Sequence, residues 1–185
     1  IFDLCVSCKA CKNECPSNVD VGAFKTEFLY QYQKANGVNL RTQVFAKNNL
    51  INQWSAPVAP LYNWINSNSL TSALVKKVAG IAEERSLPKL YSESLRSRIK
   101  SGKISLKPIH HNNRSVYLFI DEFTNYLDVT IGMDAIELLT KLGYQVKIVK
   151  HEESGRAYFS KGLLDEAQKF VDTNVGIFTD LISEN

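Results

Sequence analysis

The sequence has no cysteine after residue 15, a single methionine at position 133 and no long apolar run. A membrane-spanning helix needs about 18–20 consecutive apolar residues, so an ordinary transmembrane segment is excluded. With 22% charged and 44% hydrophobic residues, and a net charge of only +3 over 185 residues, the chain also lacks the composition of a disordered tail. A chain of this length can bury roughly 70% of its unfolded surface, so folding requires no disulfide or metal.

The start of the sequence lacks the usual features of a natural N-terminus. Ile1 is not an initiator methionine, and no basic and apolar signal peptide precedes the cysteines. We therefore expect a processed or excised part of a longer protein. Cysteines clustered this tightly do not suit a disulfide framework, which spreads its bridges through a small secreted fold. They indicate metal ligation in a reducing compartment, so a cytoplasmic location is expected.

All four cysteines lie in one run, Cys5-x2-Cys8-x2-Cys11-x3-Cys15-Pro16. This is the bacterial ferredoxin spacing for iron–sulfur clusters. Cysteines three residues apart in a tightly turning loop can direct their sulfurs to the corners of one compact cube. The proline favours an extended backbone at the residue before it, which leads the chain out of the loop. The run therefore predicts all four cysteines as metal ligands of [4Fe-4S] clusters.

In two-cluster ferredoxins the last cysteine of such a run ligates the other cluster. We therefore expect Cys5, Cys8 and Cys11 to hold one cluster and Cys15 to contribute to a second. Both clusters would need further cysteines upstream of Ile1, so a second run is expected in the parent protein. The present chain alone would then assemble its clusters poorly.

Other uses of these cysteines remain open. A structural zinc site usually draws cysteine pairs from two separate knuckles, and four ligands between residues 5 and 15 would be cramped. A thioredoxin-like pair should open a helix after a strand, but nothing strand-like precedes Cys5. The alternative function is a non-redox interaction or scaffold domain whose cysteines are vestigial or bind zinc.

The hydrophobic pattern divides the chain into two parts. Residues 1–107 are predicted to be a helical segment behind the cysteine loop, in which a helix over 17–35 has Asp20 as N-cap and ends at Gly37. Proline interrupts the pattern at 57 and 60. Further helical segments are expected at 41–54, 61–66 and 70–81, and after Pro88.

From residue 108 onward the pattern alternates between strands and helices. Strands are expected over 115–121 and 144–149, and helices over 131–142 and 160–172, the second of which continues through 174–183. A strand–helix–strand unit of this kind is parallel. The predicted fold class is therefore α+β and mostly helical, with a ferredoxin-like cysteine loop and helices over 1–107. A βαβα half-domain with a short parallel sheet, which we expect to be truncated, follows over 108–185.

Two groups of residues resemble a known family. The run Cys5–Pro16 followed by 17–21 resembles the ferredoxin-type segment in the iron–sulfur portions of FAD-linked 2-hydroxyacid oxidases or dehydrogenases, such as the glycolate oxidase type, and of anaerobic glycerol-3-phosphate dehydrogenase. Residues 121–126, 154–156 and 160–164 resemble the first half of the cysteine-rich CCG domain in the same proteins. The resemblance implies electron transfer through [4Fe-4S] clusters. It also implies FAD in the parent assembly, with a flavoprotein domain or subunit and a downstream electron acceptor as partners.

The CCG domain is named for a Cys-Cys-Gly that can ligate a further iron–sulfur centre, and the matching residues here are Glu153, Ser154 and Gly155. Because no thiolate is available, this half is expected to act as scaffold or docking surface. Gly155 is expected to permit a turn at positive φ. Phosphate binding by Gly155, Arg156 and a helix N-terminus at Ser160 is the functional alternative.

Basic residues are concentrated between 85 and 114, where eight lysines and arginines accompany only Glu93 among the acids. This stretch could dock a flavoprotein or an anionic membrane face, which makes peripheral contact with the inner side of a membrane a candidate. A solvated linker is the simpler interpretation. Nucleic acid is not an expected partner, because aromatic residues are not interleaved with the basic ones.

The sequence shows no catalytic nucleophile or general base and no glycine-rich nucleotide motif, so we expect no catalysis by this chain alone. His110, His111 and His151 are expected to be solvated surface side chains. Trp54 and Trp64 are expected to be core anchors.

Overall fold

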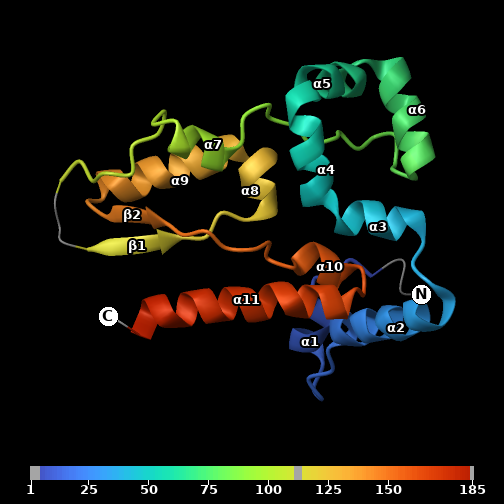
Figure 1. The fold of residues 1–185 in the computed structure, drawn as a ribbon. Helices are drawn as coiled ribbons and strands as arrows, with labels where there is room; N and C mark the ends of the chain where they lie inside the picture. The colour runs from blue at the N-terminus through green and yellow to red at the C-terminus, as the bar shows by residue number, and fades with distance from the viewer. Residues whose placement is uncertain (1–4, 111–113, 184–185) are drawn as a thin grey trace. The chain divides into compact units, whose positions relative to one another are not determined.

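The computed structural model describes residues 5–110 and 114–183. These residues form mostly helices with one two-stranded sheet, which confirms the predicted α+β, mostly helical fold (Figure 1). The chain divides into two compact units, each described by itself below. Unit 1 combines the chain up to Asn48 with the chain from Glu152 onward, and unit 2 is the continuous stretch Asn49–His151.

Unit 1 contains five helices within its described residues. They are α1 (Ala10–Glu14), α2 (Val21–Asn36), α3 (Leu40–Ala46), α10 (Arg156–Ser160) and α11 (Leu164–Ser183). As predicted, Asp20 caps α2 by accepting a hydrogen bond from the Ala23 backbone N–H at 2.9 Å, and the helix ends at Gly37 with φ 80°. The core of this unit is formed by Ala46, Tyr158, Leu163 and Ala167.

Residues far apart in the sequence join α2 to the start of α11. The Tyr30 hydroxyl donates to Asp165 Oδ1 at 2.7 Å, and Gln33 Nε2 donates to the Lys161 carbonyl at 2.7 Å. Gly162 fits against the backbone of α2, because an added Cβ would lie 2.6 Å from Leu29 Cβ and 2.9 Å from Tyr30 N. The turn between α10 and α11 therefore requires glycine for both its space and its φ of 73°.

Unit 2 begins with helices and ends in a strand–helix–strand arrangement. Its first elements are α4 (Asn48–Ser55), the 3-10 turn η2 (Ala56–Val58), α5 (Ala59–Ser67), α6 (Ser69–Ala79) and α7 (Leu95–Lys100). The later elements are β1 (Ser115–Leu118), α8 (Glu122–Tyr126), α9 (Val129–Lys141) and β2 (Gln145–Ile148). β1 and β2 pair in parallel, as predicted, and Ser115 lies opposite Gln145.

The core of unit 2 lies where α7, α8 and α9 pack together, and α9 also packs on β2 (Figure 1). Leu95, Ile120, Val129 and Ile136 form this core. Gly132 allows close packing of α9, because any side chain there would collide with Leu95 and Thr124. The helix ends before Gly143, whose φ of 88° matches the expected cap.

Several boundaries differ from the predicted ones. The short helices α8 and α10 were not expected. The helix predicted over 160–172 starts only at Leu164, as α11, and it continues through 174–183 as predicted. Pro57 lies in the 3-10 turn, whereas Pro60 lies in the first turn of α5, where its missing N–H costs no hydrogen bond. The two compact units do not follow the division at 107/108, which stays a prediction about domain architecture.

The prediction that Trp54 and Trp64 are core anchors is wrong. The two side chains are 77% and 59% exposed, and exposed apolar residues accompany them on α4, α5 and α6. Their size favoured burial, but both side chains are largely in contact with solvent among the described residues.

These are the only two tryptophans in the sequence, so the emission of the purified chain reports their surroundings directly. We expect an emission maximum typical of tryptophan in water and acrylamide quenching close to that of N-acetyltryptophanamide, measured in parallel as the control. A blue-shifted and poorly quenched emission would contradict the exposure of Trp54 and Trp64.

None of the helices that the structure describes is both long enough and apolar enough to cross a membrane.

Candidate iron–sulfur site

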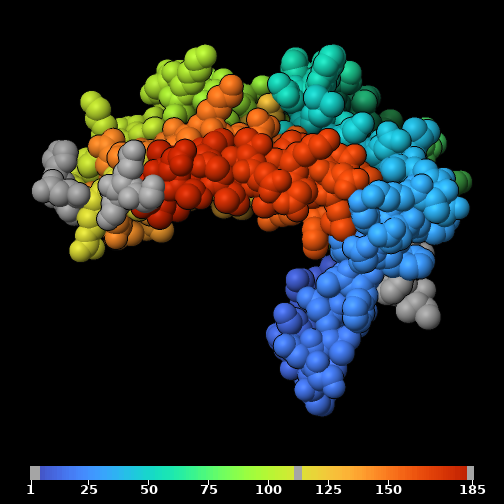
Figure 2. Space-filling model, turned by 60° about the horizontal axis from the view of Figure 1, so that its bottom comes forward, coloured from blue at the N-terminus to red at the C-terminus, as the bar shows by residue number. Residues whose placement is uncertain are grey.

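The four cysteines lie at the start of unit 1 on an exposed loop that leads into α1 and then into α2. All four are free thiols, with Cys5 and Cys15 half-buried and Cys8 and Cys11 exposed. Cys11 lies on α1, and Cys15 directly follows that helix. In the space-filling view the N-terminal segment, drawn in dark blue, presents an open surface (Figure 2). Cys8 and Cys11 are therefore accessible to an incoming metal or cluster, whereas Cys5 and Cys15 are partly covered.

The backbone of this loop turns sharply between the cysteines. Ser7 and Lys9 have φ values of 56° and 60°, in the left-handed region that residues other than glycine rarely adopt. Cys15 is extended, with φ −84° and ψ 121°, as expected for a residue before proline. A turn follows, in which the Asn18 N–H donates to the Cys15 carbonyl at 2.9 Å.

The first turns of α2 hold the loop in place. Lys9 Nζ lies 3.3 Å from Asp20 Oδ2, and Lys25 Nζ donates to the Cys5 carbonyl at 2.5 Å. The Ala23 backbone N–H lowers the pKa of Asp20, and its pairing with Lys9 lowers it further, so this carboxylate stays ionised while it caps the helix. The sequence offered no periodic signal for these roles of Lys9 and Lys25, because both depend on how the loop folds back on α2.

Backbone amides also surround the last thiol of the run. Hydrogen bonds from the backbone of Val19 and Ser17 lower the pKa of Cys15. Burial raises this pKa by less than either of these bonds lowers it, and a weaker hydrogen bond from Asn18 lowers it further. Amide hydrogen bonds favour the thiolate over the thiol, and the thiolate is the form that ligates metals. Cys15 is therefore prepared for ligation by the turn that follows it.

The residue types present fit an iron–sulfur cluster, since cysteine thiolates are its normal ligands. Within residues 5–110 and 114–183, however, no three side chains of Cys, His, Asp or Glu converge closely enough to hold a metal ion. In many small metal-binding domains the site forms only as the metal binds, because binding and folding are coupled. Ligation would thus require the loop to close its sulfurs around the cluster.

The segment that corresponds to the missing Cys-Cys-Gly is fixed to α11 within unit 1. The side chain of Asn174 accepts from the Glu152 N–H at 2.9 Å and donates to the Glu153 carbonyl at 2.8 Å. Gly155 has φ 75°, as expected, and its added Cβ would lie 3.1 Å from the Ala167 carbonyl oxygen. These contacts give the segment a packing role.

The alternative prediction, that Gly155, Arg156 and a helix N-terminus at Ser160 bind phosphate, places the helix N-terminus wrongly. Ser160 is the last residue of the five-residue helix α10 rather than the first residue of a helix, and its hydroxyl donates to the Ala157 carbonyl at 2.9 Å. No helix N-terminus therefore lies at Ser160.

His151 is not a solvated surface side chain, contrary to expectation. Within unit 2 its Nε2 accepts hydrogen bonds from the Ile120 N–H at 3.1 Å and from Arg96 Nη2 at 2.6 Å, and its ring stacks on Phe119 with centroids 3.8 Å apart. A guanidinium can only donate, so Nε2 carries no proton and the imidazole is neutral. His110 is exposed as predicted, and His111 lies outside the described residues.

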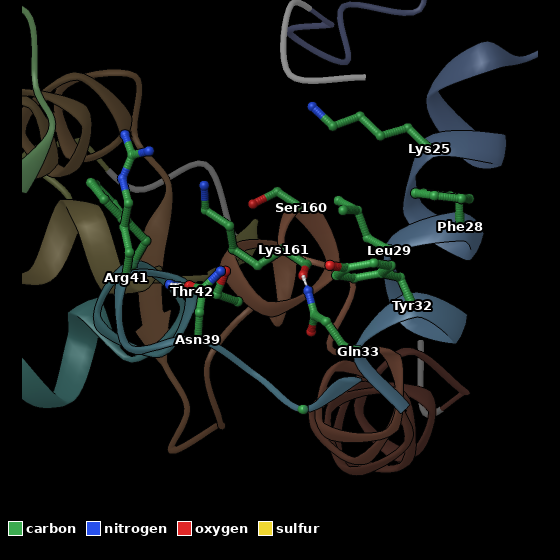
Figure 3. A pocket seen from close by; sticks show the side chains of 12 residues that line it. Lys25, Phe28, Leu29, Tyr32, Gln33, Asn39, Arg41, Thr42, Ser160 and Lys161 are labelled. Carbon is green, nitrogen blue, oxygen red and sulfur yellow. Dashed lines mark hydrogen bonds between the residues drawn. The ribbon is translucent and has the colours of Figure 1, made fainter. Parts of the chain in front are cut away.

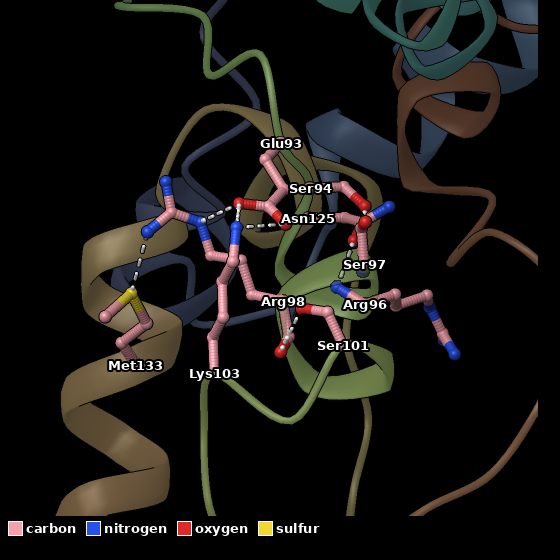
Figure 4. A network of polar contacts seen from close by, with 9 residues as sticks. All are labelled: Glu93, Ser94, Arg96, Ser97, Arg98, Ser101, Lys103, Asn125 and Met133. Carbon is pink, nitrogen blue, oxygen red and sulfur yellow. Dashed lines mark hydrogen bonds and ion pairs between the residues drawn. The ribbon is translucent and has the colours of Figure 1, made fainter.

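Part of the basic stretch 85–114 is used within unit 2 (Figure 4). The Glu93 carboxylate accepts from Lys103 Nζ at 2.7 Å and lies 3.8 Å from Arg98 Nε. Arg98 Nη1 also contacts the Met133 sulfur at 3.6 Å, and the Arg96 N–H donates to Asn125 Oδ1. The stretch is therefore a less uniform positive surface than the sequence suggested, and its contact with a flavoprotein or a membrane stays a prediction.

Comparison with characterised proteins places the chain beside parts of dehydrogenases, which confirms the resemblance seen in the sequence. It is 27% identical to D-2-hydroxyglutarate dehydrogenase of Haemophilus influenzae over 177 residues, covering 91% of this chain and 17% of that protein. It is 28% identical to the Escherichia coli enzyme of the same name over 173 residues, or 89% of this chain and 17% of that protein.

A further relative is one part of a multi-subunit enzyme. The chain is 28% identical to a subunit of the anaerobic glycerol-3-phosphate dehydrogenase of Escherichia coli over 161 residues, covering 86% of this chain and 40% of that polypeptide. The chain thus spans less than half the length of each of these relatives. No profile of a known protein family matches it, and no solved structure matches it.

Proposed function

We propose that this chain is an electron-transfer segment of a dehydrogenase, in which Cys5, Cys8, Cys11 and Cys15 ligate [4Fe-4S] clusters. The observation that carries the proposal is the cysteine run, whose spacing is that of ferredoxins. The similarity to parts of two kinds of dehydrogenase supports an oxidoreductase role. When bound, such a cluster accepts and releases one electron at a time.

The residues around the run have defined tasks in this proposal. The thiolates bind the metal, and the turn over 17–19 holds negative charge on Cys15 through backbone N–H groups. Lys25 and the Lys9–Asp20 pair attach the loop to helix α2 at Cys5 and at Lys9. Hydrogen bonds and nearby charge are the means by which a protein adjusts the potential of such a centre.

The parent protein supplies the remaining functions in this proposal. A flavoprotein domain or subunit, with FAD, oxidises a 2-hydroxy acid, and this segment carries the electrons towards a downstream acceptor. Residues 1–107 form the iron–sulfur segment, and 108–185 form the first half of a CCG-like domain that serves as scaffold. The assembly works on the cytoplasmic side, with the basic stretch 85–114 as its candidate contact with a membrane surface.

The proposal predicts a visible chromophore. Protein purified without oxygen, both as this chain and within its longer parent, is expected to be brown, to contain iron and acid-labile sulfide, and to bleach on reduction with dithionite. The parent is expected to retain more iron than the isolated chain, because a two-cluster arrangement needs more thiolates than these four cysteines supply. The matched control carries serine at Cys5, Cys8, Cys11 and Cys15.

A colourless parent protein with stoichiometric zinc would contradict this function. It would favour the alternative of an interaction domain, which draws support from the contacts of Glu153 and Gly155 with α11 in a segment without any thiolate.

A further inference from the structure

Unit 1 contains an open cavity of about 950 Å³ between α2, α3 and the end of α10. A volume of this size is at the upper end of the range for small-molecule sites. Three cationic side chains from three separate elements line it, namely Lys25 from α2, Arg41 from α3 and Lys161 after α10. Figure 3 shows these side chains reaching around the same hollow.

No carboxylate is present among the described residues that line the cavity. The positive charges of the lining side chains are therefore not balanced by a carboxylate among the described residues of the wall. The pKa of Lys161 reflects this surplus of positive charge. Burial lowers the pKa, and the positive charges of Arg41 and Lys25 lower it further. The positive charges of Arg41 and Lys25 thus disfavour the charged form of Lys161, and an anion bound in the cavity would favour it.

The cations are held in position by contacts on their own unit. The charge centres of Arg41 and Lys161 lie 5.7 Å and 4.9 Å from the centroid of the Phe45 ring. This arrangement is a pair of cation–π contacts on one aromatic ring. The Lys161 backbone is fixed by Gln33, and Lys25 is fixed by its hydrogen bond to the Cys5 carbonyl.

Aromatic side chains also line the cavity, so that part of its wall is apolar. Phe28 and Tyr32 line it with their ring centroids 6.1 Å apart in a stacked arrangement, and both side chains are exposed. They make a surface suited to the carbon skeleton of an organic ligand, whereas the cations suit its charged groups. Both features lie on one side of unit 1 within a single cavity.

We infer that this cavity binds a small ligand with two or more phosphate or carboxylate groups, which Lys25, Arg41 and Lys161 would hold. Several cations converging on one space match the separate charges of a polyanion better than a single charge. The inference goes beyond the proposed function, since it involves none of the cysteine thiols.

Isothermal titration calorimetry of the full chain at low salt tests the inference. Pyrophosphate and citrate serve as separate probes, which distinguish a phosphate from a carboxylate ligand. Saturable binding of at least one probe with a stoichiometry of one is expected. Lys161→Gln and Arg41→Gln should each weaken that binding by roughly tenfold, the loss expected when one charged contact is removed.

The matched control is Lys169→Gln, which removes the same charge from an exposed position on α11 outside the cavity and should leave binding unchanged. Circular dichroism spectra that superimpose on the wild type establish that each variant is folded. Equal weakening by all three substitutions would overturn the inference, because net charge alone would then explain the binding. Failure of both probes to bind at millimolar concentration would overturn it too.

Discussion

Replacing Cys15 by serine in the parent protein is expected to remove about half of its cluster iron, and replacing Cys8 is expected to remove the other half. The ferredoxin pattern assigns Cys5, Cys8 and Cys11 to one cluster and Cys15 to a second. Each single substitution should therefore spare one cluster. A variant with both substitutions should lose nearly all of the iron, as measured by iron and sulfide content and by electron paramagnetic resonance of the reduced protein.

The control for this series is Ser17→Ala, which changes a neighbouring side chain but keeps the backbone N–H that lowers the pKa of Cys15. Its iron content should equal that of the wild type. If Cys8→Ser and Cys15→Ser each removed all of the iron, the four thiolates would belong to a single cluster and the two-cluster assignment would be wrong.

Replacing Gly162 by alanine is expected to lower the free energy of unfolding by about 2–5 kcal/mol, because left-handed backbone and overpacking each carry a cost. The φ of this residue is 73°. The added Cβ would lie 2.6 Å from Leu29 Cβ, 2.9 Å from Tyr30 N and 3.0 Å from Leu29 C. Two of these neighbours are backbone atoms of α2, which cannot move aside without distorting the helix. Urea denaturation followed by circular dichroism measures the change.

Gly102→Ala provides the comparison, since its φ is 75° but nothing lies within 4 Å of an added Cβ. It should cost only the backbone contribution of about 1–2 kcal/mol. If the two substitutions lowered stability equally, the close approach of Gly162 to α2 would not contribute.

Features set by neighbouring residues were predictable from the sequence. Pro16 indicated the extended backbone of Cys15, Asp20 the start of α2, and Gly155 the turn before α10, because each depends on sterics or hydrogen bonds within a few residues. The parallel pairing of β1 and β2 followed from the strand–helix–strand order. The spacing of the four cysteines likewise sufficed to predict that they ligate iron–sulfur clusters.

Features that depend on distant partners were not predictable. His151 reads as a loop histidine until Arg96 and Ile120 are brought to its ring, from 55 and 31 residues away. Trp54 and Trp64 have the size of core residues, but whether a side chain is buried depends on which distant residues pack against it. Lys25 and Lys161 share a cavity only because the turn at Gly162 brings the end of α10 against α2.

The assembly of unit 1 from two separated stretches has a consequence for the order of events during synthesis. Its contacts Tyr30–Asp165 and Gln33–Lys161 span 135 and 128 residues, whereas unit 2 is one continuous stretch. Closing such long loops is entropically costly and slow, and domains emerging from the ribosome fold as their residues become available. Unit 2 can therefore fold while unit 1 still waits for α11. The helix that supports the cysteine loop acquires its final partner last, so cluster insertion into the nascent chain would meet a loop whose support is not yet complete.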